Sequence, residues 1–178
     1  MKIDIFGTGY VGLTLALVLS KHQHYVKCWD IDEVKINSYK EFKSDIREPY
    51  IDEMLYEYQK NGYLDFDLYR KDKNIATDLA IITIGTTLKD NSSKESHEKL
   101  FNLVGELVDN GVQAILLRST VEIGTCTKLN NKFGQKCNFI FAPERTVEGK
   151  AIEELLSLPQ IAACRDGKAK KLVQDCFS

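Results

Sequence analysis

The chain has 178 residues, which is enough for one well-buried domain and short for two. Its hydrophobic content of 43% and charged content of 28% are typical of globular proteins, and a net charge of −2 gives no reason to expect a nucleic-acid or membrane partner. No apolar run approaches the ~20 residues of a membrane span, and no signal segment precedes the first strand, so we expect a cytoplasmic protein. The five cysteines include no C-x-x-C pair, which predicts reduced thiols and no metal site.

The first elements are predicted to be a strand, a glycine turn and a helix. Residues 2–6 are an apolar strand, residues 10–21 are helical, and Gly7, Gly9 and Gly12 have the spacing G-x-G-x-x-G. Gly7 permits a tight turn, Gly9 lets the backbone approach a pyrophosphate, and Gly12 lets the helix pack on the strand. The free N–H groups at the helix start would face the anion.

A second strand over residues 25–30 ends at Asp30, eighteen residues after Gly12. A carboxylate at this place can accept both ribose hydroxyls of an adenosine and would repel a 2′-phosphate, so NAD is favoured over NADP. The alternative interpretation is that Asp30 only caps the helix predicted from residue 32.

Strands and helices continue to alternate along the chain. A helix over 50–60 ends at Asn61-Gly62 in a left-handed cap, and a short strand follows over 64–66. Buried strands are predicted over 79–84, 112–117 and 138–141, with a polar loop over 89–98 and helices over 100–109 and 124–133. A short helix over 152–156 and a final strand over 160–164 follow. The pattern predicts an α/β fold, a doubly wound and mostly parallel sheet over residues 1–164, with a tail over 165–178 that has room for one more helix.

Each predicted buried strand ends in small or polar residues. These clusters are Gly7, Asp30, Gly85-Thr86-Thr87, Ser119-Thr120 and Pro143-Glu144. Ligands of open α/β sheets bind outside the carboxyl ends of the strands, so we expect the clusters to line one rim that binds a cofactor and a polar substrate.

Several motifs together resemble one enzyme family. GTGYVG, DIDEVKI, REPYIDE, NGYL, RSTVEIGT and APERTVEGKAIEELLSLPQI occur in the order found in the UDP-glucose and UDP-N-acetylmannosamine 6-dehydrogenases, over about residues 1–164. The run APERTVEG is more similar to the branch that acts on N-acetylated sugars. The resemblance implies the NAD-binding domain of an enzyme that oxidises C6 of a UDP-sugar from alcohol to carboxylate with two NAD, for surface polysaccharide.

The resemblance also implies roles for individual residues. The implied cofactor-binding residues are Gly7, Gly9, Tyr10, Val11, Gly12, Asp30, Lys35, Thr86, Thr120 and Glu148. Thr120 and Glu144 would be the catalytic residues that position the water of the second oxidation. One wall of the sugar site would be formed by Glu144, Arg145, Thr146, Val147 and Glu148. From the residues alone, Thr120 could be a strand-end cap, Glu144 a helix-start carboxylate and Lys35 a solvated helix residue.

The sequence also departs from the family. Thr87 and Glu122 replace frequent prolines, and no cysteine lies in the family's nucleophilic Gly-Gly-x-Cys context. We therefore expect this chain to bind NAD without completing the oxidation. Full-length relatives form homodimers largely through a central helix, so this chain is expected to be monomeric. Two alternatives stay open, a stand-alone NAD-binding or regulatory module and the N-terminal domain of another two-domain NAD dehydrogenase.

Overall fold

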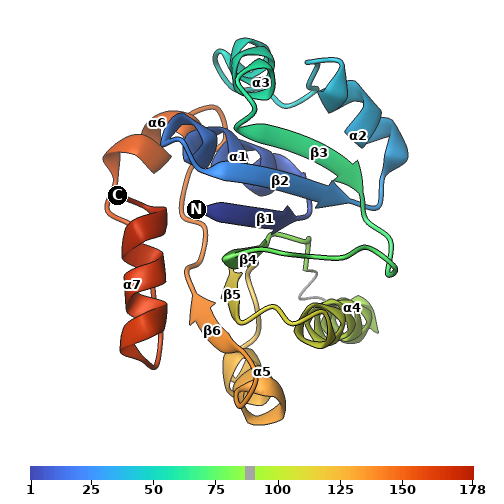
Figure 1. The fold of residues 1–178 in the computed structure, drawn as a ribbon, viewed down its shortest axis with the longest axis vertical. Coiled ribbons are helices and arrows are strands. Elements are labelled where there is room, and N and C mark those ends of the chain that lie inside the picture. Colours follow the sequence, from blue (N-terminus) through green and yellow to red (C-terminus); the bar gives the residue numbers. More distant parts are fainter. Residues whose placement is uncertain (87–90) are drawn as a thin grey trace.

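The computed structural model describes residues 1–86 and 91–178, with the backbone alone for 91–94. Within these residues six strands form one sheet in the order β3-β2-β1-β4-β5-β6, and every neighbouring pair is parallel. The strands are β1 (Lys2–Phe6), β2 (Tyr25–Asp30), β3 (Leu64–Leu68), β4 (Leu79–Ile82), β5 (Ala114–Leu117) and β6 (Asn138–Phe141) (Figure 1). The predicted doubly wound parallel sheet is confirmed.

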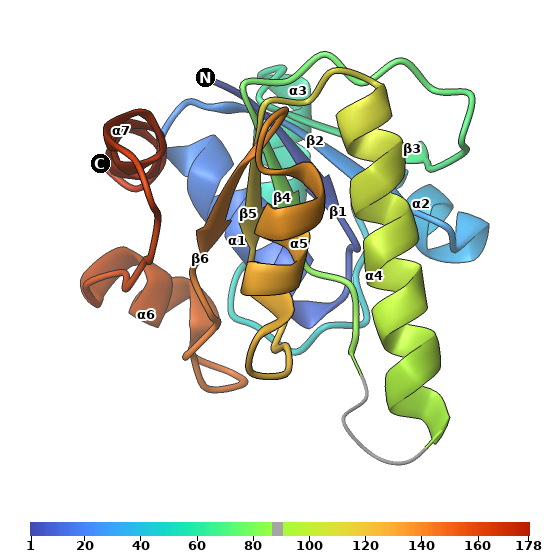
Figure 2. The same cartoon turned by 90° about the horizontal axis from the view of Figure 1, so that it is seen from below.

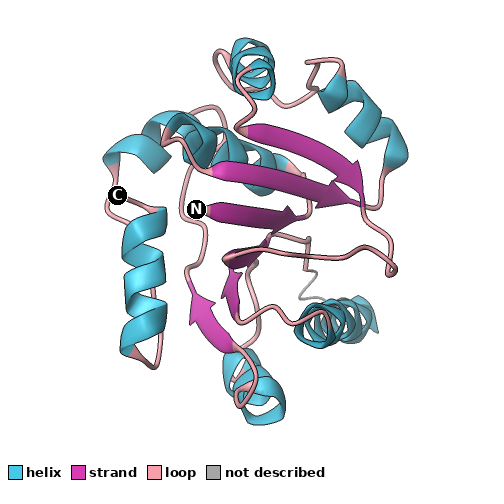
Figure 3. Ribbon diagram, in the orientation of Figure 1, coloured by secondary structure: helices cyan, strands magenta, loops and turns pink. Residues whose placement is uncertain are grey.

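Helices cover both faces of the sheet (Figure 3). One hydrophobic core includes residues from α1 (Tyr10–Lys21), α2 (Glu33–Lys40), α3 (Ile51–Lys60), α6 (Ala151–Ser157) and α7 (Gly167–Cys176). The other core lies under α4 (Asn91–Asp109) and α5 (Thr125–Phe133), which Figure 2 shows together on one side of the sheet. Every residue of β4 and β5 is buried, as expected for strands between two helical layers.

Two predicted elements are wrong. The polar loop predicted over 89–98 is helical from Asn91 onward, and residues 89 and 90 lie outside the described part of the chain. The sequence pattern did not predict this extension because the first turns carry few apolar residues. Glu95 stabilises the helix by pairing with Lys99 four residues on, at 2.7 Å. In place of the strand predicted over 160–164, the structure has a single antiparallel bridge between Ala163 and Phe141, the last residue of β6.

The last helix belongs to the same hydrophobic core as the sheet. Asp166 caps α7 by accepting a hydrogen bond from the backbone N–H of Ala169 at 2.7 Å. Ala169 and Cys176 are buried in the core on the α1 side, and Nε2 of His24 lies 3.1 Å from the carbonyl oxygen of Cys176. The domain boundary at residue 164 stays a prediction.

Asp4 is a buried carboxyl in the middle of β1, with 8% of its surface exposed. Burial raises its pKa to about 6, although Lys27 on β2 acts in the opposite direction. Because this folded pKa exceeds the unfolded value of 3.8, the contribution to stability is complete below 3.8 and is lost as the pH rises through about 6. At pH 7 the buried carboxylate therefore destabilises the fold.

We expect Asp4→Asn to raise the free energy of unfolding at pH 7.5 by on the order of 1 kcal/mol. Between about pH 4 and 6, the free energy of unfolding should also lose the part of its pH dependence that comes from the titration of Asp4. Urea unfolding at pH 5 and pH 7.5 measures both effects. Asp72→Asn is the control, because Asp72 is an exposed carboxylate in the turn after β3, and it should leave that pH dependence in place. A variant less stable than the parent protein at pH 7.5 would contradict the argument.

Candidate functional site

The glycine turn after β1 fits the roles predicted for its glycines. Gly7 has a φ of +97°, and a Cβ there would lie 3.0 Å from the backbone nitrogen of Ile84. A Cβ on Gly12 would lie 1.9 Å from the carbonyl oxygen of Gly7, so the helix can approach the turn this closely only without a side chain. A Cβ at Gly9 would meet no atom within 4 Å. The turn is thus closed around Gly7 and Gly12 and open at Gly9, as a phosphate cradle requires.

Tyr10 and Val11 are the first residues of α1, which begins after Gly9 without a side-chain cap. The N–H groups of this first turn have no partner within the helix and can bind an anion. The Tyr10 side chain serves another purpose, because its hydroxyl lies 3.2 Å from the carbonyl oxygen of Val147. Only the backbone of Tyr10 is therefore placed to meet a pyrophosphate.

Asp30 ends β2 beside the glycine turn. Its Oδ2 accepts hydrogen bonds from the backbone N–H and the hydroxyl of Thr8, both at 2.7 Å, and Oδ1 accepts one from the backbone N–H of Asp32 at 3.1 Å. Burial acts to raise the pKa of Asp30, but these bonds and the Lys35 ammonium hold it below its usual value. The carboxylate is therefore ionised and held in a fixed position beside the glycine turn.

The start of α2 excludes the alternative interpretations of Asp30 as a helix cap and of Lys35 as a solvated helix residue. The helix is capped by Asp32, whose Oδ1 accepts from the backbone N–H of Lys35 at 3.1 Å, so Asp30 is not its cap. Lys35 is two-thirds buried, and its Nζ lies 3.5 Å from Oδ2 of Asp30. Lys35 is thus paired with the predicted ribose ligand rather than fully solvated.

The ends of β4 and β5 bring Thr86 and Thr120 together. The Thr86 hydroxyl donates to the carbonyl oxygen of Thr120, and both residues line a small hollow with His97 and Glu122. The Ser119 hydroxyl fixes this edge by donating to the carbonyl oxygen of Ile84 at 2.7 Å. The neighbouring Thr87 lies outside the described residues.

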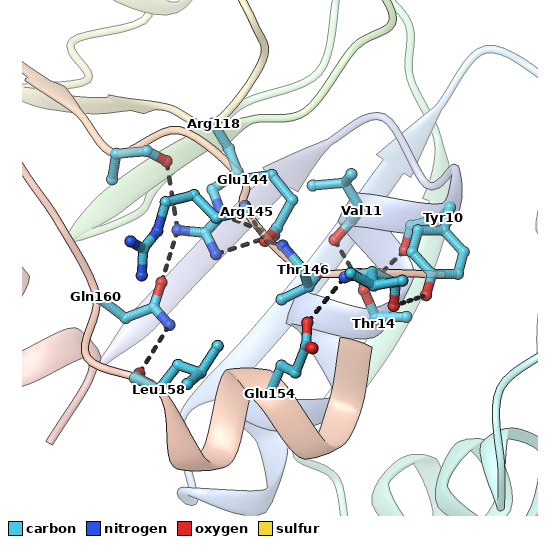
Figure 4. Close-up of polar contacts among 12 residues, drawn as sticks. Tyr10, Val11, Thr14, Arg118, Glu144, Arg145, Thr146, Glu154, Leu158 and Gln160 are labelled. Carbon is cyan, nitrogen blue, oxygen red and sulfur yellow. Dashed lines mark hydrogen bonds and ion pairs between the residues drawn. The ribbon is translucent and has the colours of Figure 1, made fainter. Parts of the chain in front are cut away.

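Glu144 follows β6 and forms an ion pair with Arg118, which follows β5 (Figure 4). Arg118 is 1% exposed, and its Nε and Nη2 lie 3.1 and 2.9 Å from Oε2 of Glu144. Oε1 of Glu144 accepts from the backbone N–H groups of Arg145 at 2.6 Å and Thr146 at 2.9 Å. Burial acts to raise the pKa of Glu144, but the Arg118 charge and these bonds hold it below its usual value.

This geometry makes Glu144 an anchor of the segment that follows it. Helix α6 begins only at Ala151, so Glu144 is not a helix-start carboxylate. Both of its oxygens already accept hydrogen bonds, and a water molecule would have to share Oε1 or Oε2 with these donors. The rim position and the negative charge needed to orient a water are nevertheless present.

The remaining wall residues lie along an exposed segment before α6. The Arg145 guanidinium donates to the carbonyl oxygen of Pro159 at 3.0 Å, and the backbone N–H of Val147 donates to Glu154 at 2.8 Å. Val147 and Glu148 are exposed, while the Thr146 hydroxyl is buried with no hydrogen-bond partner among the described residues. The segment is thus held by these contacts, and the side chains of Val147 and Glu148 remain exposed.

Sequence reasoning missed three residues that build the site. Thr8 lies inside the glycine turn, is fully buried and holds Asp30. Arg118 holds Glu144, and its signal was a single charge directly after the apolar run AILL. Glu48 lies in the REPYIDE motif and is 92% buried in a polar junction described below, although a residue before a proline in a polar link suggests only a surface position.

The described residues contain neither a candidate membrane span nor a candidate metal site. No helix in this part of the chain has the length and apolar character needed to cross a membrane. Among the same residues, no group of three His, Cys, Asp or Glu side chains could hold a metal ion.

Comparison with known proteins gives a family. The model of the UDP-glucose/GDP-mannose dehydrogenase family, NAD binding domain, matches residues 1–178. A UDP-glucose 6-dehydrogenase of Campylobacter jejuni is 30% identical over 99% of this chain and 45% of its own length, and one of Rhizobium meliloti is 27% identical over 99% and 43%. A UDP-D-ManNAc dehydrogenase from Pyrococcus horikoshii has the same fold, with a TM-score of 0.87, 23% identity, and coverage of 99% of this chain and 44% of that one.

The chain thus spans less than half the length of the curated relatives it matches. The match to the family model covers all residues that form the glycine turn, the Asp30 site and the wall before α6. The chain belongs to the UDP-glucose/GDP-mannose dehydrogenase family, as its NAD-binding domain.

Proposed function

We propose that this chain is the cofactor-binding part of a cytoplasmic nucleotide-sugar 6-dehydrogenase, which oxidises the C6 alcohol of a UDP-sugar to a uronic acid with two NAD, for surface polysaccharide. The observation that carries the proposal is the ionised Asp30 held beside the glycine turn, at the same sheet edge as the wall from Glu144 to Glu148. A cofactor and a sugar bound there would lie next to each other, as hydride transfer requires.

The residues around the proposed nicotinamide position suit the second oxidation. Converting an aldehyde to an acid would need a thiol that traps the aldehyde as a thiohemiacetal, loss of a hydride from this adduct to the second NAD to leave a thioester, and a water that then cleaves the thioester and releases the thiol. Thr120 and Glu144 supply a hydroxyl and a carboxylate at the rim, and we propose that they orient this water. Thr86 would support Thr120 through the hydrogen bond to its carbonyl oxygen.

The thiol itself is proposed to come from another part of the enzyme. Burial raises the pKa of Cys28, Cys126, Cys137 and Cys176, reaching about 12 for the last two. A thiol that stays protonated is a poor nucleophile. Cys164 packs against the core on the α1 side. These cysteines therefore suit structural roles, and the chain alone is proposed to bind NAD without turnover.

The proposed substrate is a UDP-sugar of the UDP-glucose or UDP-N-acetylhexosamine type. The similar UDP-glucose 6-dehydrogenases support the first, and the run APERTVEG supports the second. The complete enzyme is proposed to be a homodimer, with this domain by itself a monomer.

Calorimetric titration of this chain with NAD, NADP, UDP-glucose and UDP-N-acetylmannosamine tests the proposal. We expect NAD to bind with a micromolar-to-millimolar Kd, NADP at least roughly tenfold more weakly because of the Asp30 charge, and both UDP-sugars weakly. NADP binding as tightly as NAD would contradict the assigned role of Asp30. A chain that binds no NAD would overturn the proposal for the isolated domain.

A further inference from the structure

Glu48 joins three segments that are far apart in the sequence. It lies in the link between α2 and α3, and only 8% of its surface is exposed. Its Oε1 accepts hydrogen bonds from the backbone N–H groups of Gly149 at 2.7 Å and Ala151 at 3.1 Å, and from the hydroxyl of Tyr10. One buried carboxylate oxygen thus holds the start of α1 and the segment that leads into α6.

The Tyr10 hydroxyl strengthens the same junction. It accepts from the backbone N–H of Gly149 at 3.0 Å and lies 3.2 Å from the carbonyl oxygen of Val147. The contact between the Tyr10 hydroxyl and this segment can be followed in Figure 4. Gly149 has a φ of +85°, a conformation that a residue with a side chain rarely adopts. The backbone of the wall is therefore shaped to reach Glu48 and Tyr10.

The second oxygen of Glu48 indicates that stability alone does not explain this residue. Oε2 is buried and has no hydrogen-bond partner among the described residues. Burying a polar atom without a partner destabilises a fold. Such local departures from good packing are expected at functional sites.

We infer that Glu48 is a positioning residue that couples cofactor binding at the glycine turn to the ordering of residues 147–151, which contain the last two wall residues, Val147 and Glu148, and lead into α6. The inference rests on the proposed function, because the pyrophosphate of NAD would fix the backbone of Tyr10 at the start of α1. The Tyr10 hydroxyl, Glu48 and the N–H groups of Gly149 and Ala151 then carry this constraint to the wall of the sugar site. Because such a coupling is reciprocal, a sugar nucleotide that orders the wall would in turn favour NAD at the glycine turn.

Amide hydrogen exchange, followed residue by residue by NMR with and without saturating NAD, tests the coupling. In the parent protein NAD should slow exchange at Gly149 and Ala151 by roughly fivefold or more, the lower end of usual coupling strengths. In Glu48→Leu, which keeps a similar volume but removes the acceptor Oε1, the slowing should fall below about twofold, while exchange at the glycine turn still responds to NAD. The matched control is Glu53→Leu, which removes an exposed carboxylate on α3 and should behave like the parent.

A double-mutant cycle on NAD affinity separates coupling from a structural defect. Tyr10→Phe and Glu48→Leu should each weaken NAD binding. The double variant should bind NAD no more weakly than the weaker-binding single variant, because both substitutions break one chain of contacts. Equal NAD-induced slowing at 149 and 151 in the parent and in Glu48→Leu would overturn the coupling alone. No effect of NAD on the glycine turn of the parent would overturn the proposed function and the coupling with it.

Discussion

Replacing Asp30 by alanine is expected to weaken NAD binding about a hundredfold. The reason is the loss of hydrogen bonds from the ribose hydroxyls to a charged acceptor, each worth about 1.5–3 kcal/mol. The structure strengthens the expectation, because Asp30 is held by Thr8 and its pKa is lowered, so no proton has to leave before the ribose binds. Calorimetric titration with NAD measures the change directly.

The variant must be shown to be folded, since the buried N–H of Thr8 loses its acceptor, which costs about 1–3 kcal/mol. Circular dichroism at the titration temperature makes this check. Asp32→Ala is the matched control, because it removes the same charge two residues away and a helix cap worth about 1 kcal/mol. Asp32→Ala should bind NAD nearly as the parent does. If both variants bound NAD equally well, Asp30 would not be the ribose ligand.

Replacing Arg118 by methionine is expected to lower the free energy of unfolding by roughly 3–5 kcal/mol, the usual consequence of removing one partner of a buried ion pair. Arg118 is 1% exposed, and its removal leaves the buried Glu144 without the opposite charge. It also removes the donor to the carbonyl oxygen of Ala142 at 3.3 Å and to the side chain of Gln160 at 2.9 Å. Chemical denaturation at pH 7 measures the loss.

Two further variants isolate the charge effect. Arg118→Met combined with Glu144→Gln should be more stable than Arg118→Met alone, because the neutral amide still accepts from Arg145 and Thr146 without a buried charge. Arg165→Met removes an exposed arginine and should change stability little. If Arg118→Met cost no more than Arg165→Met, the pair would not anchor the wall.

The pH dependence of the same variants has a definite sign. The folded pKa of Glu144 is below the model-compound value of 4.5, so the pair stabilises the fold above pH 4.5, and this is lost as the pH falls through the lower folded value. Without Arg118, the guanidinium no longer lowers the pKa of Glu144, so this pKa should be higher than in the parent, and the stability difference between Arg118→Met and the parent should shrink as the pH falls toward and below 4.5.

The parts of the fold that were predictable from the sequence are those with a strong local signal. Strands β1, β2, β4, β5 and β6 are mainly apolar. Helix α1 follows a glycine turn whose G-x-G-x-x-G spacing is typical of a strand–turn–helix unit. The start of α4 was hidden because its first turns are polar, and a single bridge at Ala163 was mistaken for a strand since apolar residues surround it. Local pattern fails where an element is exposed or too short.

The site also has a part that was predictable from the sequence and a part that was not. Asp30 and the glycines could be placed from spacing, because strand, turn and helix are contiguous in the chain. The partners that hold the site could not be placed, since Arg118 meets Glu144 and Glu48 meets Gly149 only after the sheet has formed. Long-range pairs of this kind leave no periodic trace, and a charge beside an apolar run was the one available hint for Arg118.

The most direct test of the central claim, that NAD lies across the glycine turn and Asp30, is an NMR titration of this chain with NAD that follows each backbone amide. The account predicts the largest shifts at Gly9, Tyr10 and Val11, with further shifts at Asp32 and Thr120. It predicts none at the groove beside α3 that Phe42 and Tyr56 line. Shifts confined to that groove, or NAD binding that leaves the amides of Gly9 to Val11 unchanged, would contradict it.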